Sequence, residues 1–153
     1  MCWVVWIAAA ITALDQLTKL LVVRYLGEAE VRVVIPDFFH LVHWRNSGAA
    51  WGMLQGWNWV LAVISVITVI ALYLWRHTLQ LEKPAARIAL GLITGGIIGN
   101  FIDRVRVGSV IDFLDFQIAG RHWPAFNVAD SAICCGVALY ILVTWRSEAK
   151  ASL

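Results

Sequence analysis

The chain has 153 residues, of which 61% are hydrophobic and only 14% are charged. Its mean hydropathy of +0.76 is far above that of a soluble domain of average composition. The formal net charge of +2 is too small to indicate a nucleic-acid partner, and the length fits a single domain. The composition therefore excludes an ordinary soluble globular protein and favours a small membrane protein.

Four apolar segments fit membrane-spanning helices, each of which needs about 20 residues to cross about 30 Å of hydrocarbon. We expect these helices at about residues 3–23, 57–75, 84–102 and 128–145. The first contains Asp15 and Lys19, the second has no charged residue, and the third can begin at Pro84. The expected fold class is an all-α polytopic membrane protein, with four transmembrane helices in one membrane domain, residues 1–153.

Tryptophan is abundant and lies near the expected helix ends. Such a distribution is typical of aromatic belts at the two membrane interfaces. The residues concerned are Trp3, Trp6, Trp57, Trp59, Trp75, Trp123 and Trp145.

The third segment carries Gly91, Gly95 and Gly99 at intervals of four residues. Glycines at this spacing share one helix face and allow another backbone to approach closely. The segment lacks the strand and lysine of a phosphate-binding loop, so we expect the glycines to serve helix packing.

The positive residues indicate the orientation of the chain. The short connection at residues 76–87 and the C-terminal tail together carry five Lys or Arg residues, and the two long loops carry six. Because long loops contribute less to orientation, the density in the short segments places both termini in the cytoplasm. The long loops, about residues 24–56 and 103–127, then lie outside the cytoplasm.

The first long loop has the pattern of a small sheet at the membrane surface. The stretches VRVVI and FFHLVHW are rich in β-branched and aromatic residues and are divided by Pro36 and Asp37. The following GAAWGMLQG is apolar and predicts a short interfacial helix. We expect the sheet and this helix to form a cradle.

Two groups of ionisable residues fall within or beside the expected helices. Asp15 and Lys19 are four residues apart with the acid first, which favours an ion pair on one helix face. Asn100, Asp103 and Arg104 end the third helix, where Asp103 and Arg104 could pair locally. A structural role is the simpler interpretation of both groups.

Two further carboxylates stand out. If GSVIDFLDF is extended, Asp112 lies in an apolar row and Asp115 on the opposite, solvated face. Asn127 and Asp130 open the fourth helix, where Asn127 can act as the N-cap and Asp130 can interact with the helix dipole. Asp112 and Asp130 fall on the same side of the membrane, and two neighbouring carboxyls can share a proton as an acid/base dyad.

Other chemistries have less support. His40 and His43 are three apart in an expected strand and should face opposite ways, so we expect no metal site. A Ser47 and Lys19 nucleophile pair remains conceivable. No motif of a zinc protease or of a serine hydrolase is present.

The order of the motifs DQLTK, NSGAAWG, GNFIDRVRVGSVIDFLDF and FNVADSAI resembles bacterial lipoprotein signal peptidase, also called signal peptidase II. The resemblance runs from Asp15 to the end of the fourth expected helix. It implies a four-span aspartyl endopeptidase of the bacterial cytoplasmic (inner) membrane. Such an enzyme removes signal peptides from diacylglyceryl-modified prolipoproteins, cutting just before the lipidated Cys.

The resemblance also implies roles for individual residues. Asp112 and Asp130 correspond to the catalytic pair. The supporting polar positions are Asp15, Lys19, Asn46, Gly48, Asn100, Asp103, Arg104 and Asn127. The family implies prolipoprotein substrates, contact with membrane phospholipid, inhibition by globomycin-type cyclic peptides, an active site near the outer membrane face and cytoplasmic termini. We expect a monomer with no cofactor and no nucleic-acid partner.

Two other classes remain open from the residues alone. Asp15, Lys19 and Asp130 could form the relay of a proton-coupled transporter, although no inverted repeat is visible. Asp130 could also be only a helix cap in a membrane scaffold without catalytic activity.

Overall fold

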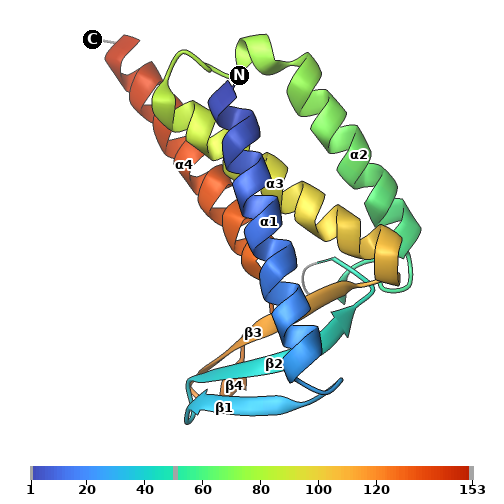
Figure 1. Ribbon diagram of the computed structural model, residues 1–153. Coiled ribbons are helices and arrows are strands. Elements are labelled where there is room, and N and C mark those ends of the chain that lie inside the picture. The colour runs from blue at the N-terminus through green and yellow to red at the C-terminus, as the bar shows by residue number, and fades with distance from the viewer. Residues whose placement is uncertain (1, 50–51, 152–153) are drawn as a thin grey trace.

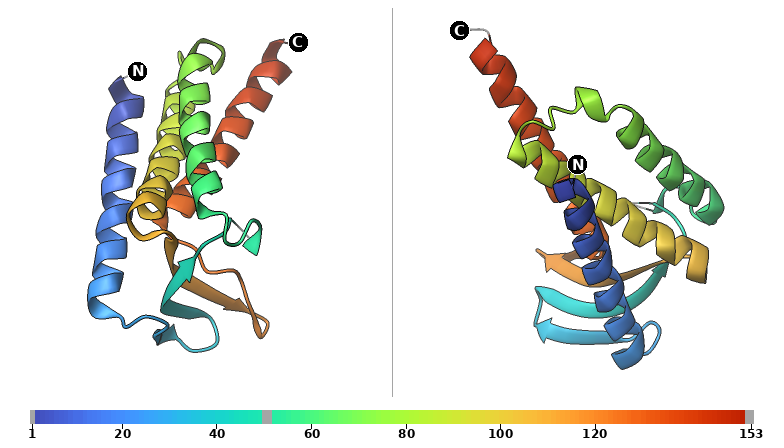
Figure 2. Two further views of the ribbon diagram at one scale, coloured as in Figure 1. Left: turned by 90° about the vertical axis from the view of Figure 1, so that its right-hand side faces the viewer. Right: turned by 45° about the horizontal axis from the view of Figure 1, so that its top comes forward.

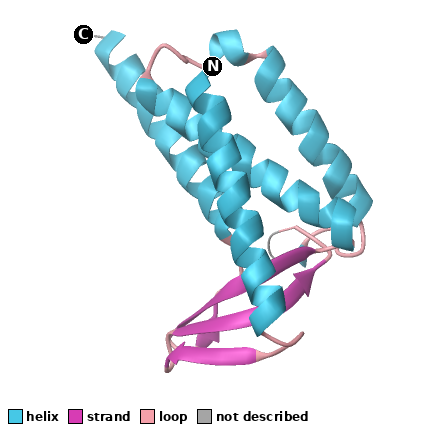
Figure 3. Cartoon of the chain, viewed as in Figure 1, coloured by secondary structure: helices cyan, strands magenta, loops and turns pink. Residues whose placement is uncertain are grey.

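The computed structural model describes residues 2–49 and 52–151, with side chains through residue 145, and is mostly helical. Its helices are α1 (Cys2–Tyr25), α2 (Asn58–Leu74), the short 3-10 helix η2 (Arg76–Thr78), α3 (Pro84–Val107) and α4 (Val128–Ala151). Its strands are β1 (Val31–Ile35), β2 (Phe39–Asn46), β3 (Val110–Ile118) and β4 (Arg121–His122). The strands lie together at one end of the helices, and the two termini lie at the other end (Figure 1, Figure 3).

Within the described part of the chain, three helices are long and apolar enough to cross a membrane: α1, α3 and α4. The fourth expected span, α2, is apolar but only 17 residues long. Helix α3 continues to Val107, five residues beyond its expected end. It ends there because Gly108 adopts a left-handed conformation with φ of 74°. Asp103 and Arg104 therefore lie on the last turns of a helix and not in a loop.

The glycines of α3 bring its neighbours into close contact. A Cβ atom at Gly91 would lie 2.7 Å from the Ile7 side chain, and one at Gly95 would lie 2.7 Å from the Ala8 carbonyl oxygen of α1. Gly96 faces α4 at the carbonyl of Ala129. The predicted packing role of Gly91 and Gly95 is confirmed, and α3 forms the centre of the helical layer.

The outer faces of the helices are apolar and exposed. The Trp residues that are described sit at two levels, as an aromatic belt requires. Those at the end with the termini are Trp3, Trp6, Trp75 and Trp145, and those at the end with the sheet are Trp44, Trp57, Trp59 and Trp123; all are exposed.

The sheet is antiparallel in the order β1-β2-β3-β4 and lies beneath the helices in the side view (Figure 2). The expectation placed it in the first long loop, but its central strand β3 and edge strand β4 come from the second. Ile111 and Phe113 of β3 are buried with Val22 of α1 in one apolar cluster. This contact fixes the sheet against α1 and leaves Asp112, between the two apolar residues, facing the other way.

The interfacial helix expected in GAAWGMLQG falls partly on Ala50 and Trp51, which lie outside the described residues. Residues 53–56 of this segment form turns.

Candidate active site

Asp112 is held on β3 by two amide side chains. Asn46 Nδ2 donates to Asp112 Oδ2 at 3.0 Å, and Asn127 Nδ2 donates to Asp112 Oδ1 at 2.8 Å. Asn46 is itself oriented by the backbone, because its Oδ1 accepts a hydrogen bond from Gly48 N at 2.9 Å. The two hydrogen bonds thus fix the orientation of the Asp112 carboxylate, which is only 4% exposed.

Asp130 is fixed at the start of α4 by a reciprocal capping arrangement. Asn127 Oδ1 accepts from Asp130 N at 3.0 Å, and Asp130 Oδ2 accepts from Asn127 N at 3.3 Å. This confirms the predicted N-cap and matches a capping box, in which the N-cap and third residues satisfy each other's backbone donors. Asp130 Oδ1 remains available for other partners and accepts from Asn100 Nδ2 at 2.7 Å.

Asn127 links the two carboxylates. Its oxygen caps Asp130 and its nitrogen donates to Asp112, and the Asn127 side chain is fully buried. Burial, and after it the nearby negative charge of Asp130, raise the pKa of Asp112 from its ordinary 3.8 to about 7, against the opposing effects of the Asn46 and Asn127 amides and of Lys19. The arrangement therefore gives Asp112 a pKa near neutrality beside a second carboxylate.

A buried ion cluster between α1 and α3 lies next to the Asp112 and Asp130 pair and orients one of its partners. Lys19 Nζ lies 2.8 Å from both Asp15 Oδ2 and Asp103 Oδ2 and donates to Asn100 Oδ1 at 2.9 Å, so its three donors are all used. With its oxygen held by Lys19, Asn100 directs its Nδ2 toward Asp130 and donates to it. The predicted Asp15–Lys19 pair is confirmed, but its larger role is to orient Asn100.

The same cluster ties the sheet and α4 to the helices. Asp15 Oδ1 accepts from Ala129 N at 2.9 Å, beside the capping box, and Asp103 Oδ2 accepts from Ile111 N at 3.3 Å, next to Asp112. Gln16, which the sequence reasoning missed, donates to Asp103 Oδ1 at 2.9 Å. The two segments that carry the carboxylates are thus anchored to one buried charge network.

Arg104 does not pair with Asp103 as the sequence suggested. Its guanidinium donates to Gly48 O at 3.2 Å and to Asn100 O at 3.4 Å, because it projects toward the first long loop while Asp103 turns inward to Lys19. Gly48 has no room for a side chain, since a Cβ atom there would lie 2.7 Å from Met53 O. Arg104 and Gly48 together hold the start of the NSGAAWG segment over the site.

The carboxylates open into a cavity of about 740 Å³ between the sheet, α3 and α4. Apolar walls surround a small number of polar groups, as in most ligand-binding cavities. Besides Asp112 and Asp130, its lining includes Asn46, Asn100, Arg104, Trp44, Gln55, Trp123, Phe126, Ser131 and Ile133. Gln55, Trp123 and Phe126 were not expected, because nothing in their local sequence distinguishes them from other loop residues.

Two other expectations are not met. Asp115 lies on the face opposite Asp112 but is 1% exposed and not solvated, because His40 and His122 cover it. Ser47 Oγ accepts from Gly56 N at 3.3 Å, while the Lys19 contacts are all with Asp15, Asp103 and Asn100. The described contacts therefore give no Ser47 and Lys19 pair.

Comparisons with known proteins agree with the geometry. A family model described as Signal peptidase (SPase) II matches residues 7–146. A lipoprotein signal peptidase of Syntrophotalea carbinolica is 46% identical over 143 residues, which cover 92% of this chain and 89% of that protein. One of Brevibacillus brevis is 46% identical over 140 residues, covering 92% of this chain and 93% of that protein.

Solved structures give the same result for the fold. One described as a bacterial membrane enzyme has a TM-score of 0.87 and 34% identity, covering 96% of this chain and 90% of that one. A second with the same description has a TM-score of 0.77 and 36% identity, covering 92% of this chain and 91% of that one. The resemblance seen in the sequence motifs is confirmed, and the chain belongs to the signal peptidase II family.

Proposed function

We propose that this protein is an intramembrane aspartyl endopeptidase that removes the signal peptide from diacylglyceryl-modified prolipoproteins, cutting just before the lipidated Cys. The observation that carries the proposal is the bridge through Asn127, which joins two carboxylates at one cavity. A cap alone would explain Asp130, but it would not explain a second buried carboxylate held by the same amide.

The two aspartates have different surroundings, which suggests different roles. Asp130 sits at the helix N-terminus and accepts from Asn100 and from a backbone N–H, both of which stabilise its ionised form. Asp112 has its pKa raised to about 7 and is partly protonated near neutral pH. We assign Asp130 as the general base and Asp112 as the general acid.

In this mechanism a water lies between the carboxyls in the cavity. Asp130 takes a proton from the water as its oxygen attacks the scissile carbonyl carbon. Protonated Asp112 donates to the carbonyl oxygen as negative charge develops there. The tetrahedral intermediate collapses when the C–N bond breaks: the proton held by Asp130 passes to the leaving amine, and the proton given to the carbonyl oxygen returns to Asp112 as the C=O bond re-forms. No metal or organic cofactor takes part.

The supporting residues act on the carboxyls without adding charge to the cavity. Asn46, Asn100 and Asn127 are amide donors that fix the carboxylate planes. The positive charge of Lys19 is already balanced by the buried Asp15 and Asp103, so it orients Asn100 and is not a nucleophile. Arg104 and Gly48 hold the first loop over the substrate.

The cavity suits an apolar, lipidated substrate. Its walls include Trp44, Trp123 and Phe126, and Ile133 and Cys134 extend it onto α4. Cys134 is exposed on the outer face of the helix, which is where acyl chains would lie. A signal helix with two acyl chains can thus enter laterally from phospholipid, and a globomycin-type cyclic peptide can occupy the same cavity. The enzyme acts as a monomer.

For the membrane arrangement we propose four spans in the bacterial inner membrane. Helix α2 is about 26 Å long at 1.5 Å per residue, and Trp57 and Trp75 at its ends bring it to the interfaces. Both termini then lie in the cytoplasm, and the sheet and the site lie near the outer face. The test starts from a chain in which the three native Cys are replaced by Ala, and one new cysteine is added at a time. A cysteine in place of the exposed Glu28 should react with an impermeant thiol reagent in intact spheroplasts, whereas a cysteine in place of Thr78 should not.

The proposed activity is tested with a synthetic prolipoprotein peptide, with and without the diacylglyceryl group, and purified protein in lipid nanodiscs. Mass spectrometry should find a single cut immediately before the modified Cys and no cleavage of the unmodified peptide. Cleavage at another bond, or equal cleavage of both peptides, would contradict the proposed specificity.

A further inference from the structure

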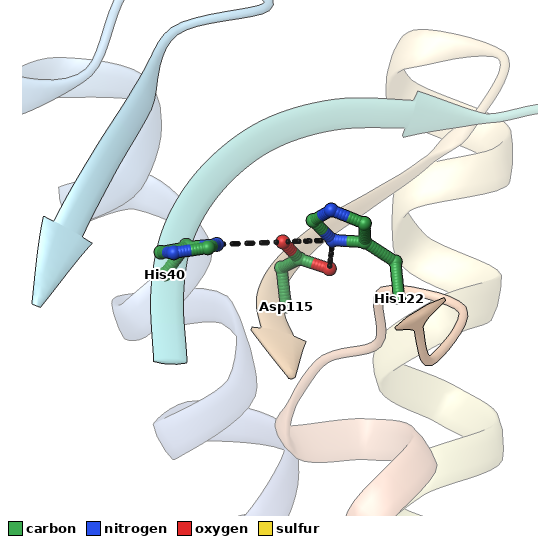
Figure 4. Close-up of side chains that lie close together, drawn as sticks. All are labelled: His40, Asp115 and His122. Carbon is green, nitrogen blue, oxygen red and sulfur yellow. Dashed lines mark hydrogen bonds and ion pairs between the residues drawn. The ribbon is translucent and has the colours of Figure 1, made fainter. Parts of the chain in front are cut away.

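A second cluster of chemically active side chains lies on the face of the sheet opposite Asp112. His40 of β2, Asp115 of β3 and His122 of β4 meet there, with the carboxylate between the two imidazoles (Figure 4). The strand register explains the meeting, because His40 pairs directly with Asp115, and His122 pairs with Gln117, two residues further along the same face. The catalytic proposal makes no use of this cluster.

The ligand atoms converge closely. His40 Nδ1 lies 3.2 Å from Asp115 Oδ2, and His122 Nδ1 lies 2.9 Å from the same oxygen and 3.0 Å from Asp115 Oδ1. One ligand atom from each residue falls within 4.8 Å of the others. Zinc binds His nitrogen and carboxylate oxygen at about 2.1 Å, so the ligand atoms of a tetrahedral site are about 3.3 Å apart. The exposed His122 ring is the ligand least enclosed by neighbouring atoms, so it can adjust toward that geometry.

The charge balance of the cluster also indicates a cation. Asp115 is 1% exposed, and among the side chains described through residue 145 its ionic partners are His40 and His122 alone. A buried carboxylate is stabilised by a nearby positive charge, which a bound divalent cation would supply. The His122 side chain is 52% exposed, so one side of the cluster is open to solvent for metal entry and for a water ligand.

We propose that His40, Asp115 and His122 form a zinc-binding site on the sheet, separate from the aspartate pair. On binding, each imidazole carries its proton on Nε2, and two Nδ1–metal bonds replace the three Nδ1–oxygen contacts with the carboxylate. The ion joins three strands from two loops that are far apart in sequence. Sequence spacing could not predict this site. The two histidines that are close in sequence are His40 and His43, but His43 contacts Leu26 O at 3.1 Å and is not part of the cluster.

The ion would stabilise the wall of the catalytic cavity. Strand β4 is only two residues long and is connected to β3 by a turn whose residues, Ala119 and Gly120, have φ of 51° and 75°. The next residues, from Trp123 to Phe126, line the cavity. A metal bond to His122 therefore secures this segment just before it reaches the site.

The test uses the full chain in detergent micelles with any affinity tag removed. Zn²⁺ is titrated by competition with a chromophoric chelator, and Co²⁺ absorption reports tetrahedral coordination. Wild type should bind one Zn²⁺ per chain, and Mg²⁺, which prefers oxygen ligands, should not compete. Asp115→Asn and the exposed-site variant His122→Ala should each weaken Zn²⁺ binding by about 100-fold or more. His77→Ala, which removes an exposed histidine of η2, should leave binding unchanged.

A second readout follows hydrogen–deuterium exchange of residues 119–126. Zn²⁺ should slow exchange there in wild type and not in His122→Ala. The proposal is overturned if wild type binds no Zn²⁺, or if His122→Ala retains the wild-type affinity and stoichiometry. Because metal binding is measured without substrate, these results are independent of the proposed peptidase activity.

Discussion

The raised pKa of Asp112 predicts a specific pH dependence of stability. Because the pKa rises from 3.8 in the unfolded chain to about 7 in the folded one, folding favours the protonated carboxyl. The resulting stabilisation is complete below pH 3.8 and is lost as the pH rises through about 7. At 1.36 kcal/mol for each tenfold change in proton affinity, the loss amounts to about 4 kcal/mol. Asp112 is 4% exposed, so solvent screening reduces this value little.

Asp112→Asn removes the titrating group and keeps the shape of the side chain. The amide loses one favourable contact, because Asn46 and Asn127 both donate to this position, and that costs about 1 kcal/mol at every pH. The melting temperature of wild type should fall between pH 5 and pH 8 by roughly 10 °C more than that of the variant. Above pH 7 the variant should be the more stable protein.

The assay is a series of thermal melts in one detergent at fixed ionic strength. Asp37→Asn is the matched control, since Asp37 is an exposed turn residue with φ of 58°, which Asn adopts easily. Its melting curve should follow that of wild type at each pH. Parallel pH profiles for wild type and Asp112→Asn would refute the argument that ionising this carboxyl is costly.

Three further predictions concern the surroundings of the site. Lys19→Met leaves the buried Asp15 without its cation and leaves Asp103 with only the half-exposed Arg106, 3.9 Å away; it should destabilise the protein by about 3–5 kcal/mol, seen as a large loss of melting temperature. Gly95→Ala places a Cβ atom against the α1 backbone and should cost about 1–3 kcal/mol, measured in the same way. Asn127→Ser keeps an N-cap oxygen for Asp130 but removes the donor to Asp112, Asn100 and Ile111, so kcat should fall about 10- to 100-fold and stability by about 1–3 kcal/mol, less than in Asn127→Ala.

Each of these variants has a control. Arg24→Met removes an exposed charge near the end of α1, and Gly27→Ala adds a methyl group where the nearest contact is a flexible Glu30 side chain. Neither substitution should change the free energy of unfolding by more than about 0.5 kcal/mol. For Asn127, the comparison is Asn127→Ala, which should lose activity and stability together. Equal stability losses in the Ser and Ala variants would show that the cap is not the stabilising contact.

The sequence predicted the helical segments and both carboxylates, because apolar length and charges within apolar segments are local signals. The position of Asp130 beside Asn127 also followed from local capping rules. The sheet was predicted only in part, since β3 alternates poorly: Val110 to Phe113 are all buried, against α1 on one side and the cavity on the other. A strand covered on both faces shows no polar face in its sequence.

The remaining errors concern long-range partners. A local ion pair was predicted for Asp103 and Arg104 because they are adjacent in sequence. Consecutive helical residues point in different directions, so Asp103 contacts Lys19 and Arg104 contacts Gly48. Asp115 was expected to be solvated because the two side chains that cover it, the buried His40 and the exposed His122, lie 75 and seven residues away in sequence. Such contacts depend on strand register, which the separate segments do not determine.

The most direct test of the central claim is single-turnover cleavage of a diacylglyceryl-modified prolipoprotein by wild type, Asp112→Asn and Asp130→Asn, each shown to be folded by its thermal melt. The account predicts that wild type cleaves the substrate and that each folded variant loses at least about a thousandfold in rate, because either amide leaves the pair without one proton-transfer group. Near-normal cleavage by either folded variant would contradict the assignment of Asp112 and Asp130 as the catalytic pair.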